Sequence, residues 1–204
     1  MTRDAVVVAM ATFAVAAALA LRGSVNVWLG TAVAAAIGVA GSVAVARGRL
    51  EPWLRPTRST GVVGFVVGVA MILATHLLYL PARALVAGLA PRVSDLYTLL
   101  EAPPGPAAAL PVVLLVVTAE ELVWRGLAVD LLQARNLRPV TVVAVATLLY
   151  ALPQIAGGGP VLVVVTLSAG LVWTVLRVVT GSLVAPFITH LVWDVGVFVL
   201  WPVA

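Results

Sequence analysis

The 204-residue sequence contains no cysteine and no lysine. Without cysteine, the chain forms no disulfide, holds no metal through thiolates and has no thiol nucleophile. Charged residues are also scarce: they make up 10% of the chain, whereas soluble domains average about 25%. This scarcity argues against an ordinary soluble domain.

Apolar residues dominate the chain instead. Hydrophobic residues make up 63% of the sequence, and the mean hydropathy is +1.17. A membrane-spanning helix needs about 20 mainly apolar residues. Seven segments come close to this criterion: 5–21, 25–46, 60–80, 108–132, 139–156, 160–178 and 182–202. The sequence therefore predicts an all-α fold, a polytopic transmembrane helix bundle of about seven spans, in which residues 1–204 form a single integral membrane domain.

The arginines indicate the orientation of this bundle. With the N-terminus inside, eight loop arginines face the cytoplasm, and only Arg22, Arg83 and Arg92 face outward. That excess satisfies the positive-inside rule. The arginines are scattered among short loops, so the sequence pI of about 10.7 reflects topology and does not indicate nucleic-acid binding. The use of Arg alone, with abundant Ala, Val and Gly, favours a bacterial source, so we expect a multi-pass protein of the cytoplasmic membrane.

Two segments have a second interpretation. Residues 1–20 resemble a signal peptide ending in a small-residue site, but their start is barely basic and another span follows closely, so we expect them to be retained. In the long connection 81–107, Val93 and Tyr97 belong to an apolar series at helical spacing. This predicts a short amphipathic helix at the membrane interface, and a surface connector is favoured over a lid.

Gly64 and Gly68, in the third predicted span, form a small-xxx-small pair, which permits close helix packing.

Three ionisable residues interrupt the fourth span. Glu120, Glu121 and Arg125 lie in the middle of an otherwise apolar segment. Each charge near a bilayer centre costs roughly 2.5–3.5 kcal/mol, so such a cluster indicates a functional site. Residues four apart share a helix face, which predicts an ion pair between Glu121 and Arg125. Glu120 lies about 100° round the helix and remains free to act as a general base on water.

The last span supplies a second polar pair. His190 and Asp194 are four residues apart and therefore lie on one helix face. Polar residues at this depth turn toward the bundle interior and find polar partners. Counted from the ends of their spans, His190 and Glu120 both fall near mid-bilayer. We therefore expect the two pairs of residues to converge.

These residues resemble a known family. The run Glu120 to Arg125 resembles the EExxxR motif of the CPBP intramembrane proteases, which include the CAAX prenyl endopeptidases, and His190 to Asp194 resembles their HxxxN/D motif. The resemblance covers residues 108–202, the expected catalytic core. It implies an intramembrane endopeptidase that hydrolyses a peptide bond in a membrane-tethered or lipidated protein or peptide. Bacterial relatives process bacteriocins, peptides and sorting tails, so prenylated substrates are not expected from a bacterial source.

The resemblance also assigns roles. Glu120 would be the base that activates the attacking water, and Arg125 the structural counter-ion of Glu121. His190 and Asp194 would stabilise the oxyanion and orient the site. Asp130, near the end of the same span, is expected to be solvated instead.

One motif departs from the family pattern. The family has FxxxH between the two motifs, and the equivalent here runs from Tyr150 to Gln154. Glutamine can hydrogen-bond a water but cannot accept its proton. Gln154 would therefore position the water. Tyr150 could donate to an oxyanion, but a plain packing residue is favoured. Pro153 should kink or end its helix.

No cofactor is expected. A catalytic zinc takes three protein ligands and an open position, and only His190, Asp194 and a glutamate are obvious donors. Zinc remains an alternative, less favoured than a metal-free, glutamate-based hydrolase. His76, the only other histidine, is expected to be capped by a neighbouring polar group rather than to join the site.

Three other functions compete with the protease. In the first, the charged residues are purely structural clamps between helices, although clamps would not need Glu120. A catalytically reduced relative, acting as a scaffold or immunity-type protein, is favoured by Gln154. A small transporter would also bury carboxylates, but the sequence lacks the repeated broken helices of such folds.

Overall fold

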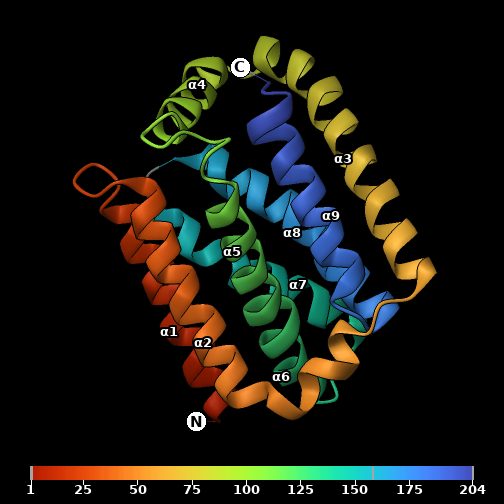
Figure 1. Cartoon of the computed structure of the whole chain (residues 1–204). Helices are drawn as coiled ribbons and strands as arrows, with labels where there is room; N and C mark the ends of the chain where they lie inside the picture. Colours follow the sequence, from red (N-terminus) through yellow and green to blue (C-terminus); the bar gives the residue numbers. More distant parts are fainter. Residues whose placement is uncertain (1, 158, 204) are drawn as a thin grey trace.

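The computed structural model describes residues 2–157 and 159–203, and within them the chain is helical with no strand. Figure 1 shows the arrangement. The α-helices are α1 (Arg3–Ala20), α2 (Val27–Leu54), α3 (Arg58–Leu85), α4 (Leu89–Leu100), α5 (Leu110–Glu120), α6 (Val129–Gln133), α7 (Pro139–Ala151), α8 (Pro160–Thr180) and α9 (Val184–Val195). Two π-helical segments, η1 (Glu121–Ala128) and η3 (Gly196–Leu200), and one 3₁₀ segment, η2 (Leu152–Gly157), continue them.

Local sequence signals account for several helix ends. The Asn26 side chain accepts hydrogen bonds from two backbone N–H groups of the first turn of α2. Thr57 and Thr60 form a reciprocal capping box at the start of α3. α8 ends at Gly181, whose φ of 67° suits glycine. After α7 the chain tightens into the 3₁₀ segment η2, which contains Pro153, as predicted.

The helices match the predicted membrane spans. Five segments are long and apolar enough to cross a membrane: α1, α2, α3, α7–η2 and α8. The charged span is one continuous helix, α5–η1–α6, and the last is the shorter α9–η3. α2 and α3 extend beyond the predicted spans 25–46 and 60–80. The helices continue through the arginine-containing segments that follow the apolar runs. The protein is an all-α integral membrane bundle, as predicted.

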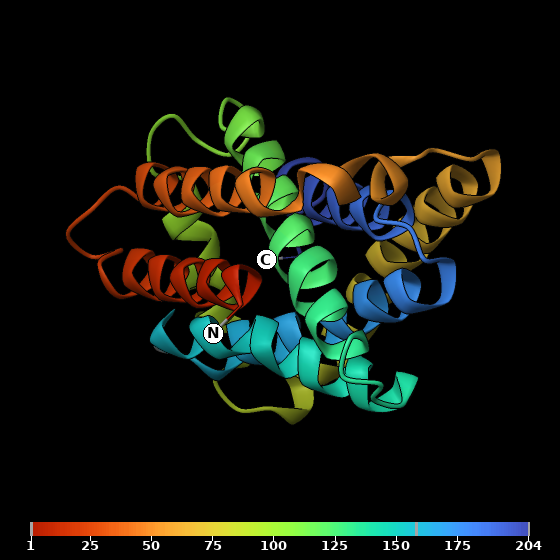
Figure 2. The ribbon, with the colours of Figure 1, turned by 90° about the horizontal axis from the view of Figure 1, so that it is seen from below.

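The helix α5–η1–α6 runs through the middle of the bundle. It contacts α2 and α9 through α5, and α1, α2, α7 and α8 through η1. Figure 2 shows this central helix passing between α1 on one side and α3 on the other. The N-terminus lies at the bottom of Figure 1 and the C-terminus at the top, at opposite ends of the bundle. The charged residues of the central helix therefore face neighbours rather than lipid.

α3 packs mainly on α9 at the edge of the bundle (Figure 1). The contact depends on glycine: a Cβ at Gly64 would lie 2.8 Å from the Ala185 carbonyl oxygen, and one at Gly68 would lie 2.8 Å from Val192 Cβ. Close packing through this small-xxx-small pair is thus confirmed. It holds α9, and with it His190, against the core.

Asp130 is part of an ionic clamp at the end of the bundle where the N-terminus lies. Its carboxylate accepts from Arg177 Nη2 at 3.0 Å and from Arg49 Nη1 at 3.3 Å, and Arg49 also pairs with Asp4 at 2.8 Å. The expectation that Asp130 is merely solvated is wrong, because residues far apart in sequence bring two guanidinium groups to it. The clamp joins α1, α2, α6 and α8.

The predicted amphipathic helix is α4, at the opposite end of the bundle (Figure 1). The Tyr97 hydroxyl donates to the Val197 carbonyl at 2.9 Å, which ties α4 to η3. Burial raises the pKa of the Tyr97 phenol above its ordinary value.

Candidate active site

His190, on α9, lies among three carboxylates. Its Nδ1–H donates to Glu121 Oε1 at 2.8 Å. Its Nε2 lies 3.7 Å from Glu120 Oε2 and 3.6 Å from Asp194 Oδ2. An ionised carboxylate only accepts, so Nδ1 carries a hydrogen and Nε2 faces the gap between Glu120 and Asp194. The fourth and last predicted spans therefore meet through the residues expected to converge.

Glu121 is shared between this imidazole and a guanidinium. Arg125 Nη1 lies 3.5 Å from Glu121 Oε1, and both side chains are almost completely buried. The same guanidinium donates through Nη2 to the Gly170 carbonyl at 3.4 Å and stacks over the Tyr150 ring at 4.1 Å. A buried charge is tolerated when it is paired in this way. Arg125 thus balances Glu121, and Glu121 orients His190.

The backbone around Arg125 is a π-helical turn, η1. The Arg125 carbonyl accepts from Arg177 Nε at 3.0 Å, which links the ionic clamp to the site. The turn packs closely on α2, because a Cβ at Gly126 would lie 2.8 Å from the Trp53 ring. Such turns occur frequently at functional sites. Nothing in our sequence analysis predicted the π-helix.

Trp173, on α8, forms the wall behind His190. The indole and the imidazole are stacked, with ring centroids 3.5 Å apart and 17° between the planes. Trp173 is 1% exposed. Our sequence analysis missed this residue, since a tryptophan in an apolar span has the pattern of any packing residue.

Tyr150, on α7, binds the remaining glutamate. Its hydroxyl donates to Glu120 Oε2 at 2.7 Å. The expectation that Tyr150 only packs is therefore wrong. The signal that would have found it is the hydroxyl itself, at a position where the family motif has phenylalanine.

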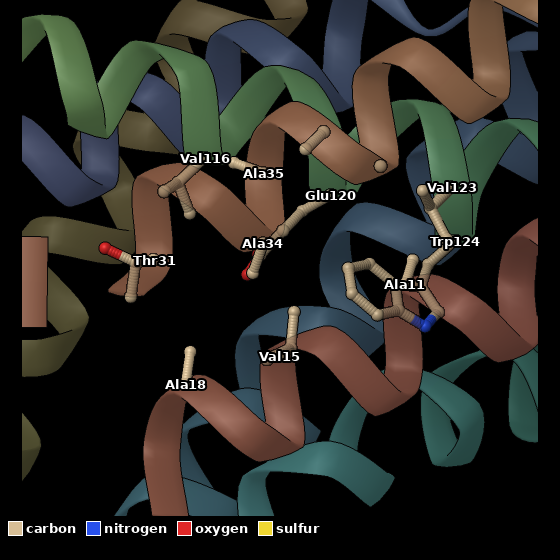
Figure 3. Close-up of a pocket in the computed structure, with 12 residues that line it drawn as sticks. Ala11, Val15, Ala18, Thr31, Ala34, Ala35, Val116, Glu120, Val123 and Trp124 are labelled. Carbon is tan, nitrogen blue, oxygen red and sulfur yellow. The ribbon is translucent and has the colours of Figure 1, made fainter. Parts of the chain in front are cut away.

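Glu120 also lines a cavity between α1, α2 and the central helix (Figure 3). The cavity measures about 40 Å³, and its walls are small apolar side chains such as Ala11, Ala18, Ala34 and Ala35. In Figure 3 the Glu120 side chain reaches from the central helix into the space between α1 and α2. A cavity needs about 10–15 Å³ to hold a water. There is room for a water molecule beside the carboxylate.

A sequence model of the family described as type II CAAX prenyl endopeptidase Rce1-like matches residues 103–196. These residues are similar to that family, and they make up slightly less than half of the chain. The match covers Glu120 to Arg125 and His190 to Asp194, and it confirms the resemblance found in the sequence. Comparisons with curated proteins and with solved structures find no match.

Gln154 follows Tyr150 within the matched segment. It is buried in η2, four residues beyond Tyr150. In the part of the chain that the structure describes, no hydrogen bond joins its amide to Glu120 or His190. Its role in positioning water stays a prediction.

His76 also lies outside the site. Its Nδ1 bonds the Ile72 carbonyl of its own helix at 3.0 Å, and its ring stacks on Trp201 with centroids 3.8 Å apart. This agrees with a histidine capped by a neighbouring polar group. His76 does not replace the histidine that the family has at position 154.

The side chains that could ligate a metal ion are partly engaged with one another. His190 Nδ1 and the Tyr150 hydroxyl are bonded to Glu121 and Glu120, while His190 Nε2 faces Glu120 and Asp194. Over residues 2–157 and 159–203, no group of at least three His, Cys, Asp or Glu side chains is arranged to hold a metal ion. The expectation of a metal-free hydrolase stays a prediction.

Proposed function

We propose that this chain is an intramembrane endopeptidase that hydrolyses a peptide bond in a membrane-tethered or lipidated protein or peptide. The similarity of residues 103–196 to a protease family supports peptide hydrolysis in general. The observation that supports the mechanism most directly is Glu120, which lines a water-sized cavity and lies 3.7 Å from His190.

In the proposed reaction, Glu120 takes one proton from a water in the cavity. The water oxygen adds to the carbonyl carbon of the scissile bond, and the carbonyl electron pair moves to its oxygen. When this oxyanion collapses, the C–N bond breaks and Glu120 returns the proton to the leaving nitrogen. A general base of this kind contributes about 10²–10⁴-fold to the rate.

His190 acts on the oxyanion. With Nδ1–H bonded to Glu121, a protonated imidazole directs Nε2–H toward the gap beside Glu120. A fixed donor aimed at developing negative charge stabilises the transition state more than the ground state. Asp194 flanks the same nitrogen at 3.6 Å and orients the ring from its other side.

The position of Glu120 within a membrane span suits a tethered substrate. The cavity of about 40 Å³ beside it has room for water, and the substrate would bring the scissile bond as an extended backbone segment. A substrate held in the bilayer presents such a backbone segment at the required depth.

The experiment that tests this proposal uses purified protein in vesicles and quenched-fluorescence peptides carrying a membrane anchor. Glu120→Gln is expected to lower kcat by about 10²–10⁴-fold, and His190→Ala to lower it strongly as well. Asp95→Asn, which neutralises an exposed carboxylate on α4, serves as the matched control and should cleave normally. Wild-type rates for Glu120→Gln would exclude Glu120 as the base.

A catalytically reduced relative is the second candidate, and Gln154 favours it. The same assay separates the two. Cleavage that is absent from the wild type and appears in Gln154→His would support the reduced relative, whereas wild-type cleavage dependent on Glu120 would support the enzyme.

A further inference from the structure

The hydroxyl of Tyr150 is a closer partner of Glu120 than His190 is. It lies 2.7 Å from Glu120 Oε2, whereas His190 Nε2 lies 3.7 Å from the same oxygen. Only the first distance is that of a hydrogen bond. Within residues 2–157 and 159–203, no hydrogen bond engages Glu120 Oε1. One carboxylate oxygen is therefore anchored, and the other is available to a water.

The Tyr150 ring is itself held from several directions. It is 3% exposed and makes edge contacts with Trp124 and Trp173, at centroid distances of 5.3 and 6.1 Å. The Arg125 guanidinium covers its face at 4.1 Å. A Cβ at Gly170 would lie 2.7 Å from Tyr150 Cδ1 and 3.2 Å from Arg125 Nη2, so any larger residue there would have to displace the ring. A ring packed this closely cannot swing its hydroxyl away from Glu120.

We propose that Tyr150 is a positioning residue for the hydrolysis: its hydroxyl holds Glu120 Oε2 so that Oε1 faces the cavity and its water. This inference rests on the proposed function. In it, Tyr150 anchors Glu120, the proposed base. A bond donated to an ionised carboxylate is among the stronger hydrogen bonds in proteins, and here it also fixes the direction of proton transfer.

The neighbouring departure from the family motif fits this assignment. Gln154 cannot accept a proton from water, and no hydrogen bond among the described residues joins it to Glu120. The group on this segment that touches the base is the tyrosine four residues earlier. Tyr150 and Gln154 therefore make separable contributions.

The test compares Tyr150→Phe with wild type in the vesicle assay, because this change keeps the ring and removes only the hydroxyl. Loss of one hydrogen bond to a charged group corresponds to a fall in kcat of about 10- to 100-fold. KM is expected to stay unchanged, since the hydroxyl touches the base and not the substrate. Thr166→Val is the matched control: it removes a buried hydroxyl that bonds only carbonyls of its own helix, and its kcat should equal that of wild type.

Ultraviolet resonance Raman spectroscopy supplies a measurement that does not need turnover. Subtracting the Tyr150→Phe spectrum from wild type isolates the Tyr150 signal, which should be that of a strong hydrogen-bond donor. In Glu120→Ala, which retains Tyr150, the donor signature should disappear. The direct difference between wild type and Glu120→Ala, which contain the same tyrosines, needs no Tyr150→Phe protein, and an unchanged tyrosine spectrum there would overturn the inference.

The outcomes for the two proposals differ. Cleavage that depends on Glu120 but is unaffected by Tyr150→Phe overturns the positioning role and leaves the proposed function standing. A wild type that cleaves none of the anchored peptides overturns both. A fall in kcat that comes with an equal rise in KM also contradicts the inference, because it would indicate a substrate contact instead.

Discussion

The indole of Trp173 lies flat on the imidazole of His190, with ring centroids 3.5 Å apart and 17° between the planes. One edge of the same imidazole is bonded to Glu121 at 2.8 Å. The stack stops the ring from tilting, and the hydrogen bond stops it from turning in its plane. Together they leave Nε2 directed at the gap beside Glu120.

We expect Trp173→Phe to lower kcat measurably, because the smaller ring no longer covers the imidazole. Aromatic pairs are worth about 0.5–1.5 kcal/mol beyond their buried area, so the variant should still fold. Trp28→Phe is the control, since Trp28 belongs to a buried cluster separate from the one that contains Trp173. Cleavage rates that fall by the same factor in both variants would show that Trp173 contributes only to general packing.

The Glu121–Arg125 pair predicts strong coupling in a double-mutant cycle. Glu121→Gln should destabilise the protein by about 3–5 kcal/mol, because it leaves the buried Arg125 without its carboxylate. Arg125→Gln should destabilise it less, because Glu121 keeps its bond to His190 at 2.8 Å. The double variant should lose much less than the sum of the two. Unfolding in mixed detergent measures the three values. Additive losses would contradict the pairing, which the structure places at 3.5 Å.

Two glycines of α3 should respond in opposite ways to alanine. Gly68→Ala introduces a Cβ 2.8 Å from Val192, and overpacking of this kind costs about 1–3 kcal/mol. Gly61→Ala meets no atom within 4 Å and should stabilise the helix by up to about 1 kcal/mol. Unfolding midpoints of the two variants decide the point. If both variants were stabilised, the close contact of α3 with α9 would be refuted.

The bond from Tyr97 to Val197 should make the attachment of α4 depend on pH. Burial raises the folded-state pKa of Tyr97 above its ordinary value of about 10. A raised folded pKa means that the stabilisation is complete below pH of about 10 and is lost as pH rises through the higher folded value. Proteolysis of α4 should therefore accelerate in strongly alkaline buffer. Tyr97→Phe, which has no phenol to ionise, should show a flat pH dependence between the same buffers.

Local patterns sufficed for much of the structure. The spans follow from runs of apolar residues, and the Glu121–Arg125 pair follows from a four-residue spacing on one helix. The contact between His190 and Glu120 was predictable as well. Both residues lie near the middle of their membrane spans, and neither side chain is tolerated in lipid.

Other features depend on contacts that no local pattern encodes. Asp130 meets Arg49 and Arg177, which lie 81 and 47 residues away in the chain. Trp173 becomes part of the site only because α8 packs beside α9. The π-helical turn at Arg125 also receives a long-range bond, because its carbonyl accepts from Arg177, 52 residues away.

The cavity beside Glu120 is lined by two separate parts of the chain. Its charged floor belongs to the matched segment 103–196, while most of its walls belong to α1 and α2, which precede that segment. Exchange of a few alanines in those first two helices would change the volume of the cavity without altering an ionisable residue. The space beside Glu120 can thus be varied from a part of the chain that carries none of its charges.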